Sequence, residues 1–160
     1  MNTKIYLDTS IPSAYFGYTK PLRQLITQKW FENEANSYEI YISTLTIQEI
    51  NKYKNEEKKD NILSLVLEHT FRILDLDKEI SDLADQYIDK GAIPGTERED
   101  AMHIASAAVN NIESLASWNS KHIVSINPIR KIHQINAENK YGVVEIGSLE
   151  LFGGHKYGNL

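Results

Sequence analysis

The 160-residue chain contains no cysteine, which excludes disulfide bonds and thiolate metal sites. A metal ion bound here must therefore take oxygen or imidazole ligands. The chain also lacks an apolar run of the roughly 18 residues that a membrane-spanning helix needs. The N-terminal stretch MNTKIYLDTS reaches an aspartate before the apolar region of a signal peptide could form. We therefore expect a cytoplasmic protein that has no membrane-spanning segment.

An excess of basic residues is missing as well. The formal net charge is −5, whereas binding to a phosphate backbone draws on clustered lysine and arginine. An acidic metal site adds negative charge without preventing such binding, because the bound cation cancels that charge locally. The net charge therefore neither supports nor excludes nucleic-acid binding.

Length and composition fit a single compact domain, since 41% of the residues are hydrophobic and neither repeats nor a dividing linker are apparent. The last residues, GGHKYGNL, show no core-forming pattern. We predict one domain over residues 1–152 and a flexible tail over residues 153–160.

Short β-prone segments alternate with segments of helical periodicity along the chain. The expected strands cover residues 4–7, 39–43, 71–74, 114–117 and 143–146, and the clearest helices cover residues 22–34, 80–88 and 97–109. Strands separated by helices indicate an α/β domain with a mainly parallel sheet.

Polar side chains follow three of the expected strands. Asp8 comes directly after the first, Glu49 lies within two helical turns of the second, and Asn119 follows the fourth. In open α/β sheets, ligands bind beyond the carboxyl ends of the strands. Asp100 lies near the start of the alanine-rich helix 97–109, where the helix dipole favours a carboxylate. We expect these side chains to converge on one edge of the sheet.

Converging carboxylates repel one another unless a cation or a proton lies between them. Oxygen ligands with water in the remaining positions are typical of Mg²⁺ or Mn²⁺. Such an ion can activate water and offset charge on the phosphorus of a diester. The sequence therefore predicts phosphodiester hydrolysis, with Asp8, Glu49 and Asp100 as metal ligands.

Four segments carry a family resemblance. In order, YLDTSIPSAYF, TLTIQEI, EREDAMHIASA and SWNSKHI resemble the acidic motifs of the PIN-domain nucleases, and of the VapC-type toxins in particular. The resemblance implies an α/β/α sandwich with a parallel central sheet, a divalent metal ion and cleavage of single-stranded RNA. It also implies a paired antitoxin protein that silences the nuclease, and homodimers are common in the family.

The resemblance assigns roles residue by residue. Asp8, Glu49 and Asp100 match the first three acidic positions of the family. Many relatives have aspartate at the fourth position, where this chain has Asn119, a neutral group that can orient water. Ser117 can add a hydroxyl to the cluster.

Each candidate also has a simpler interpretation. Asp8 can cap a helix, and Glu49 can be an ordinary surface residue. Glu97 and Asp100 can be first-turn acids favoured by the dipole, although Glu97 is also a candidate auxiliary carboxylate. His103 can pair with Asp100 across one helical turn or act as a structural hydrogen-bonding group.

Basic and aromatic residues near the motifs have two interpretations. Arg98, Lys121, Arg130 and Lys131 either line an RNA path or are solvated surface cations. Trp118 either stacks on a base or packs in the core.

Two other functions compete with the nuclease. In a haloacid-dehalogenase-like phosphatase Asp8 would be a covalent nucleophile, but such enzymes usually carry a second aspartate where this chain has Ser10. In a PIN-like RNA-binding or regulatory module, the change to Asn119 would have removed turnover.

Overall fold

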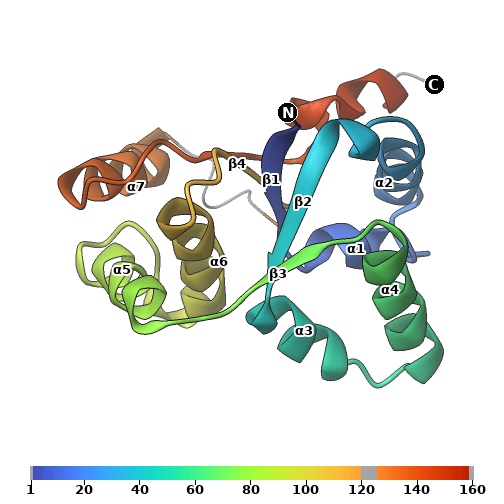
Figure 1. Ribbon diagram of the computed structural model, residues 1–160, viewed down its shortest axis with the longest axis horizontal. Coiled ribbons are helices and arrows are strands. Elements are labelled where there is room, and N and C mark those ends of the chain that lie inside the picture. The colour runs from blue at the N-terminus through green and yellow to red at the C-terminus, as the bar shows by residue number, and fades with distance from the viewer. Residues whose placement is uncertain (1, 120–125, 159–160) are drawn as a thin grey trace.

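A parallel sheet forms the centre of the molecule (Figure 1). The structure is a computed structural model that describes residues 2–119 and 126–158. The sheet has five strands in the order β3-β2-β1-β4-β5, and every neighbouring pair is parallel. The strands are β1 (Thr3–Leu7), β2 (Tyr38–Ser43), β3 (Arg72–Leu74), β4 (Ser114–Ala116) and β5 (Glu145–Gly147).

Helices cover both faces of the sheet, so the expected three-layer α/β/α architecture is confirmed (Figure 1). One face carries α5 (Lys78–Asp89), α6 (Arg98–Val109) and α7 (Ile126–Glu138). The other carries α1 (Ser10–Ala14), α2 (Pro21–Asn33) and α4 (Glu56–Glu68). Helix α3 (Thr44–Asn51) follows β2 at the edge where the strands end, and the 3₁₀ turns are η1 (Ala35–Ser37), η2 (Gly95–Glu97), η4 (Leu149–Phe152) and η5 (Gly154–Tyr157). None of the helices in the described residues is long and apolar enough to cross a membrane.

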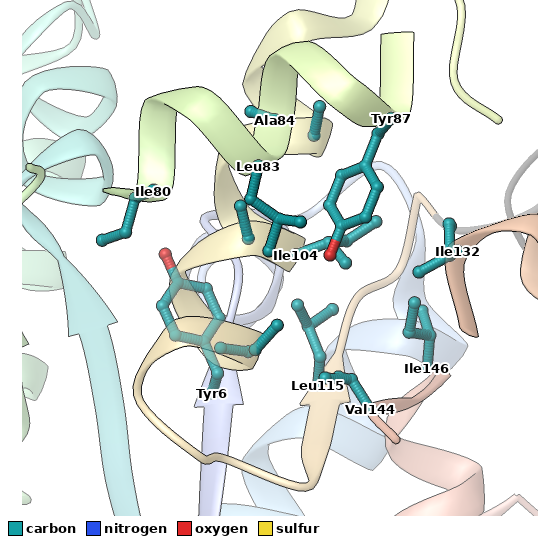
Figure 2. Close-up of a cluster of buried hydrophobic side chains, with 14 of the residues drawn as sticks. Tyr6, Ile80, Leu83, Ala84, Tyr87, Ile104, Leu115, Ile132, Val144 and Ile146 are labelled. Carbon is teal, nitrogen blue, oxygen red and sulfur yellow. The ribbon is translucent and has the colours of Figure 1, made fainter. Parts of the chain in front are cut away.

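The alternation of side chains along β1 divides the interior into two cores. Ile5 and Leu7 point into the core formed with α1, α2 and α4, and Tyr6 points into the core formed with α5, α6 and α7. Figure 2 shows Tyr6 beneath α5 in the second core, together with Leu83 and Ile104. Because Ile5, Tyr6 and Leu7 are fully buried, the register of β1 fixes the position of the next residue, Asp8.

Two parts of the chain differ from the expectation. Helix α7 was not predicted, and the last strand starts at Glu145, since Val143 is exposed. Within the segment predicted to be a flexible tail, residues Gly154–Tyr157 form η5, which packs against α2. The indole nitrogen of Trp30 in α2 donates to the carbonyl of Phe152, at 2.9 Å, just before this segment.

Candidate active site

A cavity of about 450 Å³ lies at the edge where the strands end. It is lined by residues that follow β1, β2 and β4 and by the start of α6, as the strand-end rule predicts. Among the lining residues are the candidates Asp8, Glu49, Asp100 and Asn119. Four segments far apart in the sequence therefore meet around one space.

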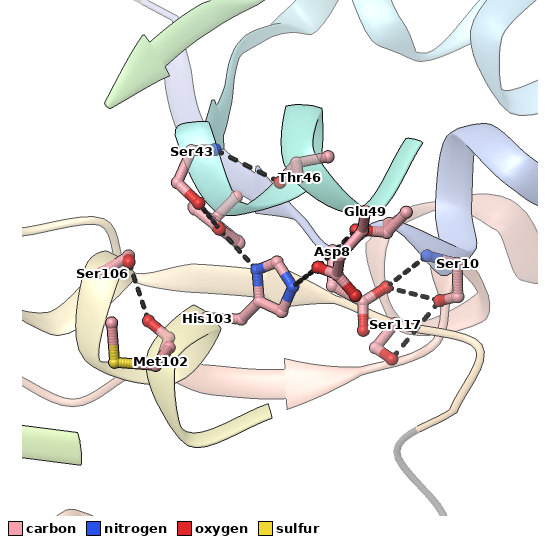
Figure 3. Close-up of polar contacts among 11 residues, drawn as sticks. Asp8, Ser10, Ser43, Thr46, Glu49, Met102, His103, Ser106 and Ser117 are labelled. Atoms are coloured by element: carbon pink, nitrogen blue, oxygen red, sulfur yellow. Dashed lines mark hydrogen bonds and ion pairs between the residues drawn. The ribbon is translucent and has the colours of Figure 1, made fainter. Parts of the chain in front are cut away.

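Asp8 forms part of the wall of this cavity and is itself buried, with 6% of its surface exposed. Its Oδ1 accepts hydrogen bonds from the Ser10 amide, at 3.0 Å, and from the Ser10 hydroxyl (Figure 3). Burial raises the pKa of the Asp8 carboxyl, and the His103 charge and the hydrogen bonds from Ser10 and Ser117 only partly offset this. The bond to the Ser10 amide at the start of α1 resembles a capping interaction, so the structural and functional interpretations of Asp8 coexist.

Ser10 connects the first motif to the fourth. Its hydroxyl donates to Asp8, accepts the Trp118 amide at 2.9 Å, and lies 3.5 Å from the Ser117 hydroxyl. The Ser117 hydroxyl in turn accepts the Asn119 amide at 3.0 Å. The residues after β1 and those after β4 thus form one hydrogen-bonded unit that includes the Ser117 hydroxyl.

Glu49 is held through one of its oxygens. Its Oε1 accepts from the Thr9 hydroxyl at 2.9 Å and lies 2.7 Å from Nε2 of His103. Burial opposes ionisation of Glu49, yet these hydrogen bonds and the His103 charge hold its pKa below the usual value. Glu49 is therefore not an ordinary surface residue.

His103 is buried between Glu49 and a tyrosine rather than paired with Asp100. Its Nδ1 lies 2.6 Å from the Tyr6 hydroxyl, which donates to the Ser43 hydroxyl at 2.9 Å (Figure 3). Burial disfavours the imidazolium, but the Tyr6 oxygen, the hydrogen bond to Glu49 and the Asp8 charge raise the pKa of His103 above 6.5. The imidazolium then donates to Tyr6 and to Glu49, and every group in the row has a partner.

The sequence interpretation overlooked Glu99, which also lines the cavity. Burial and the neighbouring Glu49 carboxylate raise the pKa of Glu99, because two carboxylates close together disfavour each other's charge. Glu99 occupies a first-turn position in α6, where an acid needs no functional explanation, so the sequence carried no signal that singled it out.

Glu97, the candidate auxiliary carboxylate, lies apart from Asp8 and Glu49. It lines a neighbouring cavity of about 990 Å³, which Asp100 and Asn119 also border. Lys121 and His122 of the fourth motif fall outside the described residues.

The donor set matches a hard cation in its chemistry. Asp8, Glu49, Glu99 and Asp100 bring carboxylates to one cavity, and Mg²⁺ is commonly bound by one or two carboxylates with water and phosphate oxygens. The raised pKa of Glu99 beside Glu49 reflects a repulsion that a bound cation would also relieve. Within residues 2–119 and 126–158, no three His, Asp or Glu side chains lie close enough together to hold an ion. The residues fit Mg²⁺ or Mn²⁺, and the three-residue ligand set stays a prediction.

The cations near the site differ from those proposed from the sequence. The cavity is lined by Lys20, Arg23, Lys52 and Lys58. Arg98 is instead bound to Asp85 and Ser81, and the Lys131 amine lies 3.5 Å from the Gly91 carbonyl. Trp118 is buried, and Arg23 lies 5.4 Å from the centre of its ring, so it is a core residue and not an open surface for base stacking.

Comparison with known proteins identifies a family for this architecture. The family model described as the PIN domain matches residues 5–122, which include the first three motif segments and all but the last residue of the fourth. A search among curated proteins finds none that matches.

Solved structures share the fold at low sequence identity. A chain of VapBC2 from Rickettsia felis, solved with a DNA fragment from the promoter, is 16% identical with a TM-score of 0.60, over 90% of this chain and 98% of that one. A chain of a toxin–antitoxin complex from Klebsiella pneumoniae is 19% identical with a TM-score of 0.55, over 78% of this chain and 93% of that one. VapC20 of Mycobacterium tuberculosis, a toxin that cleaves the sarcin-ricin loop, is 13% identical with a TM-score of 0.56, over 77% of this chain and 95% of that one. These likenesses concern the fold alone.

Proposed function

The chain belongs to the PIN-domain family, and from this membership we propose that it is a divalent-metal-dependent endoribonuclease that hydrolyses single-stranded RNA. One observation carries the proposal: Asp8, Glu49 and Asp100 come from three separate elements and line the same cavity at the carboxyl edge of the sheet. A fold alone does not imply an activity, but a convergent set of acids at this edge supports one.

Asp8, Glu49 and Asp100 are the residues that would hold Mg²⁺ or Mn²⁺. When bound, such an ion activates water and offsets charge on the phosphorus. The protein's own part is to fix its carboxylates: Ser10 bonds Asp8 twice, and Thr9 and His103 both bond one oxygen of Glu49. Asn119 borders the cavity as a neutral group that can orient water.

A toxin–antitoxin role follows as part of the same proposal. The structures from Rickettsia felis and Klebsiella pneumoniae are described as VapBC2 and as a toxin–antitoxin complex, and VapC20 as a toxin that cleaves the sarcin-ricin loop. We propose that this chain is the toxin of such a pair, acts in the cytoplasm, and binds an antitoxin protein and a second copy of itself.

One other function retains support. A PIN-like module that binds RNA without cleaving it would explain why the fourth acidic position is Asn119, and why no three-ligand group is assembled in the part of the chain that the structure describes. The phosphatase is disfavoured, because Ser10 occupies the position at which such enzymes usually carry a second aspartate.

A cleavage assay separates the two functions. Metal-stripped protein is mixed with labelled single-stranded RNA, and Mn²⁺ or Mg²⁺ is then added. We expect cleavage only with metal, and Asp8→Asn should lower its rate by more than about 100-fold, beyond the loss typical of a group that merely supports a metal ligand. Asp89→Asn, an exposed change at the far end of α5, is the matched control and should cleave like wild type.

Two results would count against the nuclease. Cleavage without added metal, or cleavage that Asp8→Asn leaves intact, contradicts the proposed mechanism. RNA binding without cleavage under any metal condition favours the regulatory module. Because Asn has nearly the shape of Asp, the unfolding midpoint of Asp8→Asn should stay close to that of wild type, which shows that the fold is retained.

A further inference from the structure

The candidate active site lies directly beside the neighbouring cavity. The two cavities, of about 450 and 990 Å³, share lining residues from α2, α6 and the segment after β4. The shared residues are Lys20, Arg23, Glu99, Asp100, Trp118 and Asn119. A chain molecule that occupies both cavities must therefore pass between the cations at the start of α2 and the acids at the start of α6.

Arg23 is held in place at this junction. Its guanidinium lies 5.4 Å from the centre of the Trp118 ring, a cation–π distance. The Trp118 indole nitrogen donates to the Thr27 hydroxyl at 3.0 Å, and that hydroxyl donates to the carbonyl of Arg23 itself at 2.6 Å. Arg23, Thr27 and Trp118 thus contact one another in turn. The hydrogen bond to Thr27 fixes the buried Trp118 ring, and this ring in turn positions the Arg23 guanidinium.

Within the described part of the chain, no acidic partner neutralises the charge of Arg23. Among the described residues it forms no ion pair, although carboxylates line the same two cavities. Arg98, the other arginine that borders the larger cavity, is bound to Asp85 and Ser81. A positioned guanidinium with unused donors is suited to a planar anion such as a phosphodiester, which it can bind through two hydrogen bonds.

We propose that Arg23 binds a backbone phosphate of the RNA strand at the junction, next to the phosphate that is cleaved, so that the strand runs from one cavity into the other. This assignment rests on the nuclease function proposed above. Lys20 lies on the same side of the passage and adds positive charge for the adjoining phosphate. Trp118 is buried beside the guanidinium of Arg23 and acts as a positioning residue, since it acts through Arg23.

The test measures RNA binding without cleavage. Full-length wild-type protein in the presence of a chelator is titrated into a short fluorescein-labelled single-stranded oligoribonucleotide at several salt concentrations. Each phosphate contact contributes about 0.7 to the slope of log Kd against log salt. Arg23→Gln should reduce the slope by about that amount and weaken binding roughly tenfold at low salt.

Two further variants make the result specific. Arg72→Gln removes an arginine that is paired with Glu39 and lines neither cavity, so it should leave both slope and affinity unchanged. Arg23→Lys keeps the charge but not the planar pair of donors, so we expect a wild-type slope with weaker binding. Equal slopes for Arg23→Gln and wild type, or equal losses in Arg23→Gln and Arg72→Gln, would overturn the assignment, as would a wild-type protein that does not bind the oligonucleotide.

Failure of the nuclease proposal gives a different pattern. If the protein binds RNA with the expected dependence on Arg23 but never cleaves it, the Arg23 assignment holds and the nuclease proposal fails. If the protein cleaves RNA but Arg23→Gln does not change the salt slope of binding, the nuclease proposal holds and the Arg23 assignment fails.

Discussion

Four side chains connect the first two motifs through the protein interior. Ser43, Tyr6, His103 and Glu49 form a row in which Tyr6 donates to Ser43, and both ring nitrogens of His103 can donate when the imidazole is protonated. Tyr6 is fully buried and His103 nearly so, so none of these bonds is readily replaced by water. The row ends on Glu49, so the buried Tyr6 hydroxyl is linked through His103 to a carboxylate of the candidate site.

Removal of one hydroxyl tests this row. Tyr6→Phe removes the hydroxyl that bonds to His103 and to Ser43 in the interior. The loss of these two buried bonds should lower the free energy of unfolding by about 1–3 kcal/mol. Tyr141→Phe is the matched control, because its hydroxyl contacts Glu79 at the surface, and it should change stability by less than about 0.5 kcal/mol. Urea unfolding measures both, and similar losses in the two variants would show that the buried row has no special weight.

Single residues differ in how far the sequence could place them. Asp8 and Asn119 could be predicted, because each directly follows a short β-prone segment and strand ends gather at one edge. The contact of His103 with Glu49 and the contact of Arg23 with Trp118 could not. Each joins elements far apart in the chain, and no local pattern encodes which side chains of those elements meet.

At the scale of elements, α6 places Asp100 and Glu99 beside the sheet. Its small side chains allow α6 to pack closely against both α5 and β4, and Ala101, Ala105 and Ala108 are almost completely buried. The sequence predicted this helix well, since small residues recur at helical spacing. A larger side chain on the buried face of α6 should therefore disturb both the core and the start of α6, where Glu99 and Asp100 lie.

An enlarged side chain in α6 measures how tightly that layer is packed. Ala105→Leu inserts volume where the exposed fraction is 0% and should destabilise the protein by about 1–3 kcal/mol. Ala137→Leu makes the same change on the exposed side of α7 and should stay within about 0.5 kcal/mol of wild type. Thermal and urea unfolding report the difference, and a neutral Ala105→Leu would mean that the layer yields easily.

Helix α7 shows why an element can be overlooked. It is rich in Asn, His, Gln and charged residues, which hides a spacing of three between Ile129, Ile132 and Ile135. That spacing is compatible with one helix face, and Ile132 and Ile135 are in fact buried. Asn136 is buried as well, and its side-chain oxygen accepts from the Tyr87 hydroxyl, so a polar residue here belongs to the core.

At the scale of the whole molecule, the C-terminal segment closes the face formed by α2. Lys156 and Tyr157 bond to Glu34 at the end of α2, at 2.6 and 3.2 Å. Between them and η4 lies Gly154, which is buried. A Cβ at this position would lie 2.6 Å from the Leu149 carbonyl oxygen and 3.0 Å from Ile26, so only glycine fits.

Substitution of this glycine tests whether the segment contributes to stability. Gly154→Ala forces backbone apart and should lower the free energy of unfolding by about 1–3 kcal/mol. Gly142→Ala has no atom within 4 Å of the new Cβ and should be neutral or slightly stabilising. The two unfolding curves decide the matter: a neutral Gly154→Ala would mean that residues 153–158 separate from α2 at little cost, as a tail would.

The pairing of β1 with β4 also has a consequence for protein synthesis. The Asp8 amide bonds to the Ala116 carbonyl at 3.1 Å, and the Ser10 hydroxyl receives the amide of Trp118. A ribosome has therefore translated the first three motifs before it adds the residues that complete the surroundings of Asp8. An unfinished chain lacks one wall of the cavity, so any activity of this site begins only once the fourth motif has left the ribosome and folded back onto the first.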